Sequence, residues 1–146
     1  MNLSKHFTLE ELTLSDYAIR NDIDNTPDSD AVLNLITLCD KVLEPLRDIV
    51  KRPIQITSGY RSPFVNLGIG GSRTSQHSEG KAADIVVPNM SIDELFDIAS
   101  KFVPFDQCIH EFSRWLHISY NGQANRKEVL WAVKENGKTV YKHSIL

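Results

Sequence analysis

The stretch SQHSEGKAAD, residues 75–84, places a histidine and an aspartate seven residues apart, with one glycine and two alanines between them. His77 and Asp84 carry imidazole nitrogen and carboxylate oxygen, two of the atom types that bind zinc. Gly80 permits a sharp reversal of the chain, and the two alanines leave room for close packing around an ion. The spacing fits two metal ligands, and it equally fits a surface histidine followed by an aspartate that ends a loop.

Two predicted strands flank this stretch. AADIVVP, residues 82–88, is apolar enough for a buried strand, and PIQITS, residues 53–58, has the β-branched residues and the period of two that favour a strand. Between them, residues 59–81 contain five glycines and several serines and show little periodicity. A long segment without periodic structure inside a compact domain is usually functional or disordered. We therefore expect an open loop with room for a substrate.

Helices are predicted on both sides of this region. Thr8 with Glu11 forms a capping box that predicts a helix over residues 9–20. Apolar residues recur at helical spacing from 32 to 50, where Pro45 should kink or break the helix. A second capping box predicts a helix from residue 91 to about residue 102.

The last third of the chain has the pattern of an antiparallel meander. We expect strands at residues 107–112, 115–120, 129–134 and 138–142. Asn136-Gly137 between the last two is the preferred two-residue hairpin turn. The fold class is therefore α+β, with N-terminal helices packed on a mostly antiparallel sheet in a single domain spanning residues 1–146.

Composition excludes several classes of protein. A net charge of −3 argues against a dedicated nucleic-acid binder, and no apolar run reaches the roughly 20 residues of a membrane span. The N-terminus lacks the apolar stretch of a signal peptide, so we expect synthesis in the cytoplasm without signal-dependent secretion. Cys39 and Cys108 show no CxxC spacing, and we expect both to be buried small hydrophobic residues.

A third candidate ligand lies in EFSRWLHISY, residues 111–120. Period-two alternation puts Trp115, His117 and Ser119 on the face opposite the apolar one. Alone, His117 would be a histidine on a solvated strand face. With His77 and Asp84 it completes the three protein ligands of a catalytic zinc site.

Three further residues are candidates for chemistry. Glu111, six residues before His117, can be brought near it by a tight turn and act as a general base. Arg61 follows a predicted strand and can hold a carboxylate or an oxyanion bidentately, or form a surface salt bridge. Ser75 can hydrogen-bond a ligand or substrate, or cap the loop. His110 alternates to the face opposite Glu111, so we expect a structural role for it.

These motifs resemble those of a known family. ITSGYRSPFVN, SQHSEGKAADI and EFSRWLHIS occur in the same order and with similar gaps in the M15-type zinc peptidases. That family includes D-Ala-D-Ala carboxypeptidases and dipeptidases and the L-alanyl-D-glutamate endopeptidases of phage lysins, and its fold is shared with Hedgehog proteins. The resemblance extends from about residue 6 to residue 120.

The resemblance implies roles for individual residues. Zinc ligands fall on His77, Asp84 and His117, and the charge-stabilising, substrate-binding arginine on Arg61. Many members carry the catalytic acid three residues before the last histidine, where this chain has Arg114. A carboxylate six residues before it, as at Glu111, is similar to the zinc domain of Hedgehog proteins and to one peptidase branch.

The implied activity is zinc-dependent hydrolysis of amide bonds involving D-amino acids in peptidoglycan stem peptides. Zinc would activate water, Glu111 would take its proton and Arg61 would stabilise the oxyanion. A phage-type endopeptidase acting at the bacterial cell wall after release, a D,D-carboxypeptidase and a cytoplasmic D-Ala-D-Ala dipeptidase all remain open. So does a non-catalytic zinc-stabilised binding module. We expect a monomer whose partner is a peptidoglycan peptide, with no nucleic-acid or membrane partner.

Overall fold

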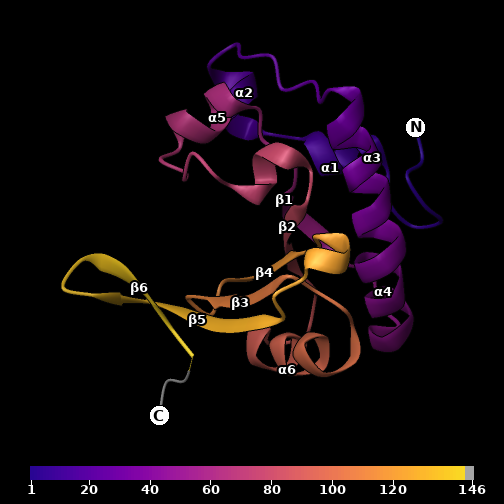
Figure 1. Ribbon diagram of the computed structural model, residues 1–146, viewed down its shortest axis with the longest axis vertical. Coiled ribbons are helices and arrows are strands. Elements are labelled where there is room, and N and C mark those ends of the chain that lie inside the picture. The colour runs from indigo at the N-terminus through magenta and orange to yellow at the C-terminus, as the bar shows by residue number, and fades with distance from the viewer. Residues whose placement is uncertain (144–146) are drawn as a thin grey trace.

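The computed structural model, which describes residues 1–143, contains one six-stranded sheet of order β1-β2-β4-β3-β5-β6 (Figure 1). Its strands are β1 (Gln55–Ser58), β2 (Ala82–Val86), β3 (Gln107–Glu111), β4 (Trp115–Ser119), β5 (Glu128–Glu135) and β6 (Lys138–Lys142). The α+β class is confirmed. The sheet is mixed, however, because β3 and β5 pair in parallel while the other neighbours are antiparallel.

The parallel pair follows from strand order. Both edges of β4 are occupied, by β2 and by β3, so the next strand cannot pair with β4. The chain instead passes through the short helix η3 (Gly122–Ala124) to the free edge of β3. The predicted meander is therefore wrong at this connection. It is correct for the last hairpin, where Asn136 and Gly137 have φ angles of 52° and 77°.

The predicted first helix, residues 9–20, is in fact two short helices. They are α1 (Leu9–Thr13) and α2 (Asp16–Arg20). The capping box at Thr8 is present as predicted. Leu14 is extended, and the hydroxyl oxygen of Ser15 accepts a hydrogen bond from the Ala18 N–H, which starts a new helix. The break is thus a second N-cap.

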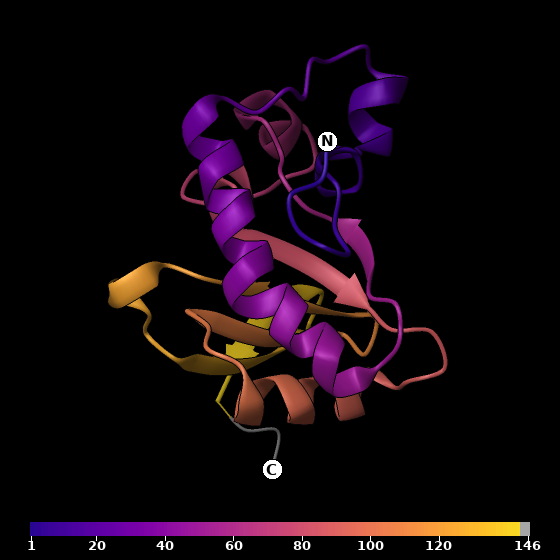
Figure 2. The ribbon, with the colours of Figure 1, turned by 90° about the vertical axis from the view of Figure 1, so that its right-hand side faces the viewer.

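The long central helix is continuous but changes its hydrogen bonding before Pro45. It comprises α3 (Ser29–Leu38), the π-helical turn η1 (Cys39–Leu43) and α4 (Glu44–Val50). In η1 the Glu44 N–H donates to the Cys39 carbonyl, one residue further back than in an α-helix. This wider turn accommodates a proline without breaking the helix, which crosses one face of the sheet (Figure 2). No helix within residues 1–143 is long and apolar enough to span a membrane.

The main hydrophobic core lies between this helix, α6 (Ile92–Phe102) and one face of the sheet. Its fully buried side chains include Leu35, Leu38, Val42, Leu46, Ile85, Leu95, Leu116 and Ile118. Cys39 and Cys108 are free and buried in it, as predicted, and burial raises the pKa of each thiol to about 12. His110 is buried on the same face, with Nε2 2.6 Å from Asp93 Oδ1 on α6.

The segment of residues 59–81 is more ordered than expected. It contains α5 (Pro63–Gly68) and the 3₁₀ turn η2 (Gln76–Glu79), so only its remaining residues form the open loop that we expected. The Ser62 hydroxyl caps α5, and Pro63 occupies its first turn. Gly80 ends η2 with φ 75°, and a Cβ there would lie 2.4 Å from the Ala31 carbonyl oxygen. Only glycine meets both conditions.

Candidate metal centre

The face of the sheet that turns away from the core carries the candidate residues. Asp84 on β2 lies directly opposite His117 on β4. Their chain neighbours Ile85 and Leu116 point into the core, so the predicted alternation is confirmed. Of the two alanines beside Asp84, Ala83 also packs in the core. The expectation that both alanines surround an ion is therefore wrong for Ala83.

His77 joins these two residues from η2. Its Nε2 lies 3.4 Å from Asp84 Oδ1, and His117 Nδ1 lies 3.0 Å from the same oxygen. The three ligand atoms that these residues offer all lie within 4.8 Å of one another. Tetrahedral ligands at zinc bond lengths are separated by roughly 3.3–3.5 Å. Small side-chain adjustments therefore suffice for the three to hold one ion.

The orientation of the His77 ring is fixed by the backbone. Its Nδ1 lies 2.8 Å from the Gly59 carbonyl oxygen, which can only accept a hydrogen bond. Nδ1 must therefore carry the hydrogen, and Nε2 keeps a lone pair directed toward Asp84. Burial lowers the pKa of His77, which favours the neutral form that binds metals.

The charge of Asp84 is balanced by its neighbours. Burial alone would raise the pKa of this carboxyl, but the neighbouring imidazoles of His77 and His117 outweigh burial and hold the pKa well below its usual value. Its second oxygen, Oδ2, lies 3.4 Å from Nη2 of Arg61. Asp84 is thus an ionised, almost fully buried ligand candidate.

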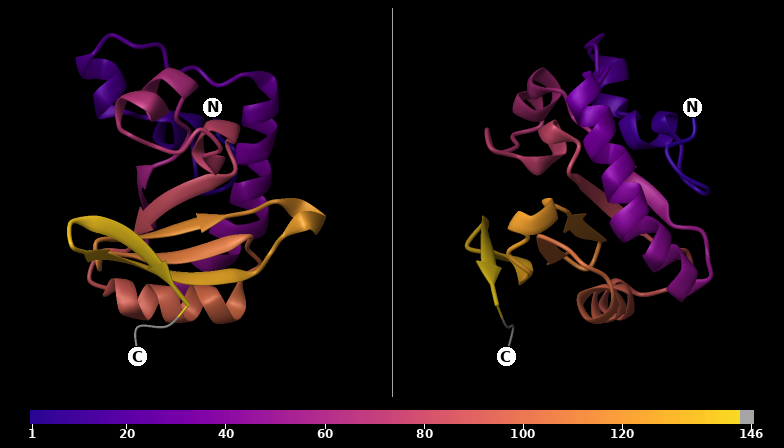
Figure 3. Two further views of the ribbon diagram at one scale, coloured as in Figure 1. Left: turned by 60° about the vertical axis from the view of Figure 1, so that its left-hand side comes forward. Right: turned by 45° about the vertical axis from the view of Figure 1, so that its right-hand side comes forward.

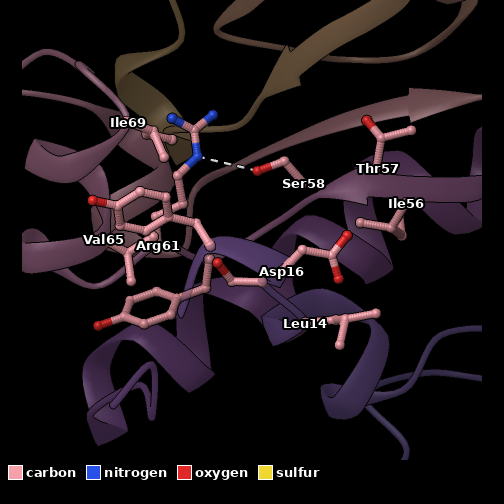
Figure 4. A pocket seen from close by; sticks show the side chains of 11 residues that line it. Leu14, Asp16, Ile56, Thr57, Ser58, Arg61, Val65 and Ile69 are labelled. Carbon is pink, nitrogen blue, oxygen red and sulfur yellow. Dashed lines mark hydrogen bonds between the residues drawn. The ribbon is translucent and has the colours of Figure 1, made fainter. Parts of the chain in front are cut away.

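Arg61 does not form a surface salt bridge, because only 15% of its side chain is exposed and its partner Asp84 is buried. Nε donates to Ser58 Oγ at 3.1 Å, as Figure 4 shows, and Nη1 donates to Asn66 Oδ1 at 3.4 Å. Burial lowers the pKa of the guanidinium. Arg61 stands between a pocket of about 210 Å³ beside β1 and the larger cavity at the metal centre. Sequence reasoning missed Asn66, which lies on the unpredicted helix α5.

Glu111 lies beside the cluster, at the end of β3. Its Oε1 is 3.6 Å from His117 Nδ1. Burial, and then the charge of Asp84, raise the pKa of Glu111. Phe112 and Ser113 both have positive φ angles in the tight turn that brings β3 back into β4. Arg114, three residues before His117, is exposed in that turn.

The candidate residues Arg61, His77, Asp84, Glu111 and His117 all line one cavity of about 860 Å³. Ser75 also lines it, and its hydroxyl oxygen accepts a hydrogen bond from the His77 N–H at 3.2 Å. Ser75 therefore caps η2, the turn that carries His77. The cavity leaves one side of the ligand cluster open to solvent.

A buried carboxylate that sequence reasoning missed supports this arrangement. Asp106 binds Arg126 bidentately, with Nε 3.0 Å from Oδ1 and Nη2 2.7 Å from Oδ2. Gln76, adjacent to His77, donates to Asp106 Oδ2 at 2.8 Å. The hydrogen bond from Arg126 is the main reason why the pKa of Asp106 falls to about 2. The three residues are far apart in sequence, so no local pattern indicates the network.

The sequence matches a known protein family over the segment that contains the site. The sequence profile of the family described as Peptidase M15 matches residues 5–119. The matched segment includes all six residues proposed from the sequence for this site. A search of curated proteins found no match. Because the match covers well over half of the chain, the protein belongs to the peptidase M15 family, a family of metallopeptidases.

Proposed function

We propose that this protein is a zinc-dependent peptidase that hydrolyses amide bonds involving D-amino acids in peptidoglycan stem peptides. The observation that carries the proposal is the position of the Glu111 carboxylate next to the His77, Asp84 and His117 cluster in one open cavity. A half-buried carboxylate beside the open side of the cluster is placed to take a proton from water, which a binding module does not require. The substrate class is supported by membership of the M15 family.

The donor set fits zinc. Two imidazole nitrogens and one carboxylate oxygen are a common ligand set for catalytic zinc, and His77 Nε2, Asp84 and His117 Nδ1 would provide it. Zinc bound there would polarise the scissile carbonyl and lower the pKa of water.

The protein's own residues would move the proton and hold the peptide. Glu111 takes a proton from the attacking water as the water oxygen bonds to the carbonyl carbon. It then delivers that proton to the amide nitrogen as the C–N bond breaks. Its raised pKa suits both steps, because a base and acid works best with a pKa near the working pH. Arg61 holds a substrate carboxylate or the developing oxyanion.

The test is cleavage of purified muropeptides, with the products identified by mass. We expect cleavage by zinc-loaded wild type, none after treatment with EDTA, and kcat/KM lowered by about 100- to 10,000-fold in zinc-loaded Glu111→Gln. The fragment masses would name the bond and separate endopeptidase from carboxypeptidase or dipeptidase activity.

Two results would contradict the proposal at different points. Full activity of zinc-loaded Glu111→Gln would reject Glu111 as the base. If wild type with one tightly bound zinc cleaved no muropeptide from several wall types, the protein would be a zinc-stabilised binding module.

A further inference from the structure

One row of paired residues crosses the sheet from Glu111 to the last strand. Glu111 on β3 pairs with Ala132 on β5, and Ala132 pairs with Tyr141 on β6. Side chains of directly paired residues point to the same face of a sheet. Tyr141 therefore shares the cavity face with Glu111, two strand spacings or roughly 9–10 Å away along the sheet.

Ala132, the residue between Glu111 and Tyr141 in this row, has a small side chain. Ala132 is fully buried and carries only a methyl group, so no bulky side chain of β5 separates the ring of Tyr141 from Glu111. The β5–β6 hairpin lies on the side of the molecule away from α3 (Figure 3). Tyr141 lines the cavity together with Asp84, Glu111 and His117, while 56% of it remains exposed. A tyrosine in this position can contact a bound ligand.

The electrostatic environment agrees with this geometry. Partial burial, followed by the charges of Glu111 and Asp84, raises the pKa of Tyr141. The phenol is therefore protonated at neutral pH and available as a hydrogen-bond donor. The same two carboxylates that belong to the candidate centre act on this hydroxyl.

Residue 141 also lies beyond residues 5–119, the part of the chain that the M15 family profile matches. The hairpin thus adds a side chain to the cavity from outside the matched segment.

We propose that Tyr141 is a substrate-binding residue of this peptidase, an inference that rests on the proposed function. Its ring forms the wall of the cavity beside Glu111, and its hydroxyl donates a hydrogen bond to an oxygen of the bound peptide. The hairpin therefore contributes to the choice of substrate.

The test separates the hydroxyl from the ring. Zinc-loaded Tyr141→Phe should raise KM for a cleavable muropeptide by about 3- to 10-fold with kcat within about twofold, and Tyr141→Ala should raise KM further. Tyr120→Phe is the matched control, because Tyr120 packs against the core and does not line the cavity. Zinc affinity and the melting temperature should stay at wild-type values in Tyr141→Phe.

Binding measurements distinguish failure of this inference from failure of the proposed function. Titration of the same muropeptides into zinc-loaded Glu111→Gln, with and without Tyr141→Phe, reports binding without turnover. Weaker binding on loss of the hydroxyl supports the inference even if wild type cleaves nothing. Unchanged KM and unchanged binding in both Tyr141 variants would overturn it, as would a KM change that only follows a loss of zinc or of stability.

Discussion

The two faces of strands β2 and β4 are buried for different reasons. On the core face, Ile85 and Leu116 are fully buried under the α3–α4 helix and α6. On the other face, their neighbours Asp84 and His117 face the cavity and are buried almost as deeply, with side chains 8% and 12% exposed. One stretch of backbone therefore presents a hydrophobic surface on one side and a set of ionisable groups on the other.

Burial therefore has a different effect on the free energy of folding at each face. Burial of an aliphatic side chain stabilises the fold by roughly 1.5–3 kcal/mol. Burial of a carboxylate is costly unless partners compensate. At Asp84 those partners are His77 from η2, His117 from β4 and Arg61 from the connection between β1 and α5. Substitutions on the core face should therefore reduce stability, and substitutions on the cavity face should reduce metal binding and activity.

The largest expected effect is that of Asp84→Asn on the metal centre. Loss of the anionic ligand should lower zinc affinity by more than roughly 100-fold, because even changes to groups behind the ligands cost 10- to 100-fold. Cleavage of muropeptides should become undetectable. Competition with a chelating dye measures the affinity, and Asp97→Asn on the exposed side of α6 is the control. Wild-type zinc affinity in Asp84→Asn would show that Asp84 is not a ligand.

Ile85→Ala, at the neighbouring position on the core face, should reduce stability and leave zinc affinity nearly unchanged. Removing this fully buried side chain should lower the free energy of unfolding of EDTA-treated protein by about 3 kcal/mol. Zinc affinity of the protein that remains folded should change by less than about threefold. Urea titration measures the stability. A loss of zinc affinity as large as that of Asp84→Asn would show that the two faces are not independent.

The core face could be predicted from the sequence, and the cavity face only in part. Alternation in β4 correctly separated Leu116 from His117, since a period of two is a local property. Alternation cannot distinguish a cavity from solvent, however. The burial of His77 and Asp84 depends on α5, η2 and their packing. The signals for α5 were present at Ser62 and Pro63, but the density of glycine and serine obscured them.

Contacts between residues far apart in the sequence could not be predicted from local sequence patterns. The parallel pairing of β3 with β5 depends on which strand edges are already occupied, and together with the β5–β6 register it places Tyr141 in the row of Glu111. The contact between Gln76 and Asp106 joins residues thirty positions apart. Capping and turn residues such as Thr8, Asn136 and Gly137 were predicted correctly because their hydrogen bonds and backbone angles are local.

The smallest expected effect belongs to Asp106, which connects the cavity face to the C-terminal strands. Asp106→Asn removes a bidentate partner of Arg126 and should lower the free energy of unfolding by about 2 kcal/mol at neutral pH, the value that corresponds to a pKa lowered from 3.8 to about 2. Because the folded-state pKa is lowered, this stabilisation is complete above about pH 5 and is lost as the pH falls from 4 to 2. Urea titrations of wild type and Asp106→Asn should therefore differ by a constant amount above pH 5 and converge near pH 2.

The control is Asp97→Asn, which should stay within about 0.5 kcal/mol of wild type at every pH, as expected for an exposed ion pair. A difference between wild type and Asp106→Asn that persisted at pH 2 would mean that Asp106 stabilises the fold by packing and not by its charge.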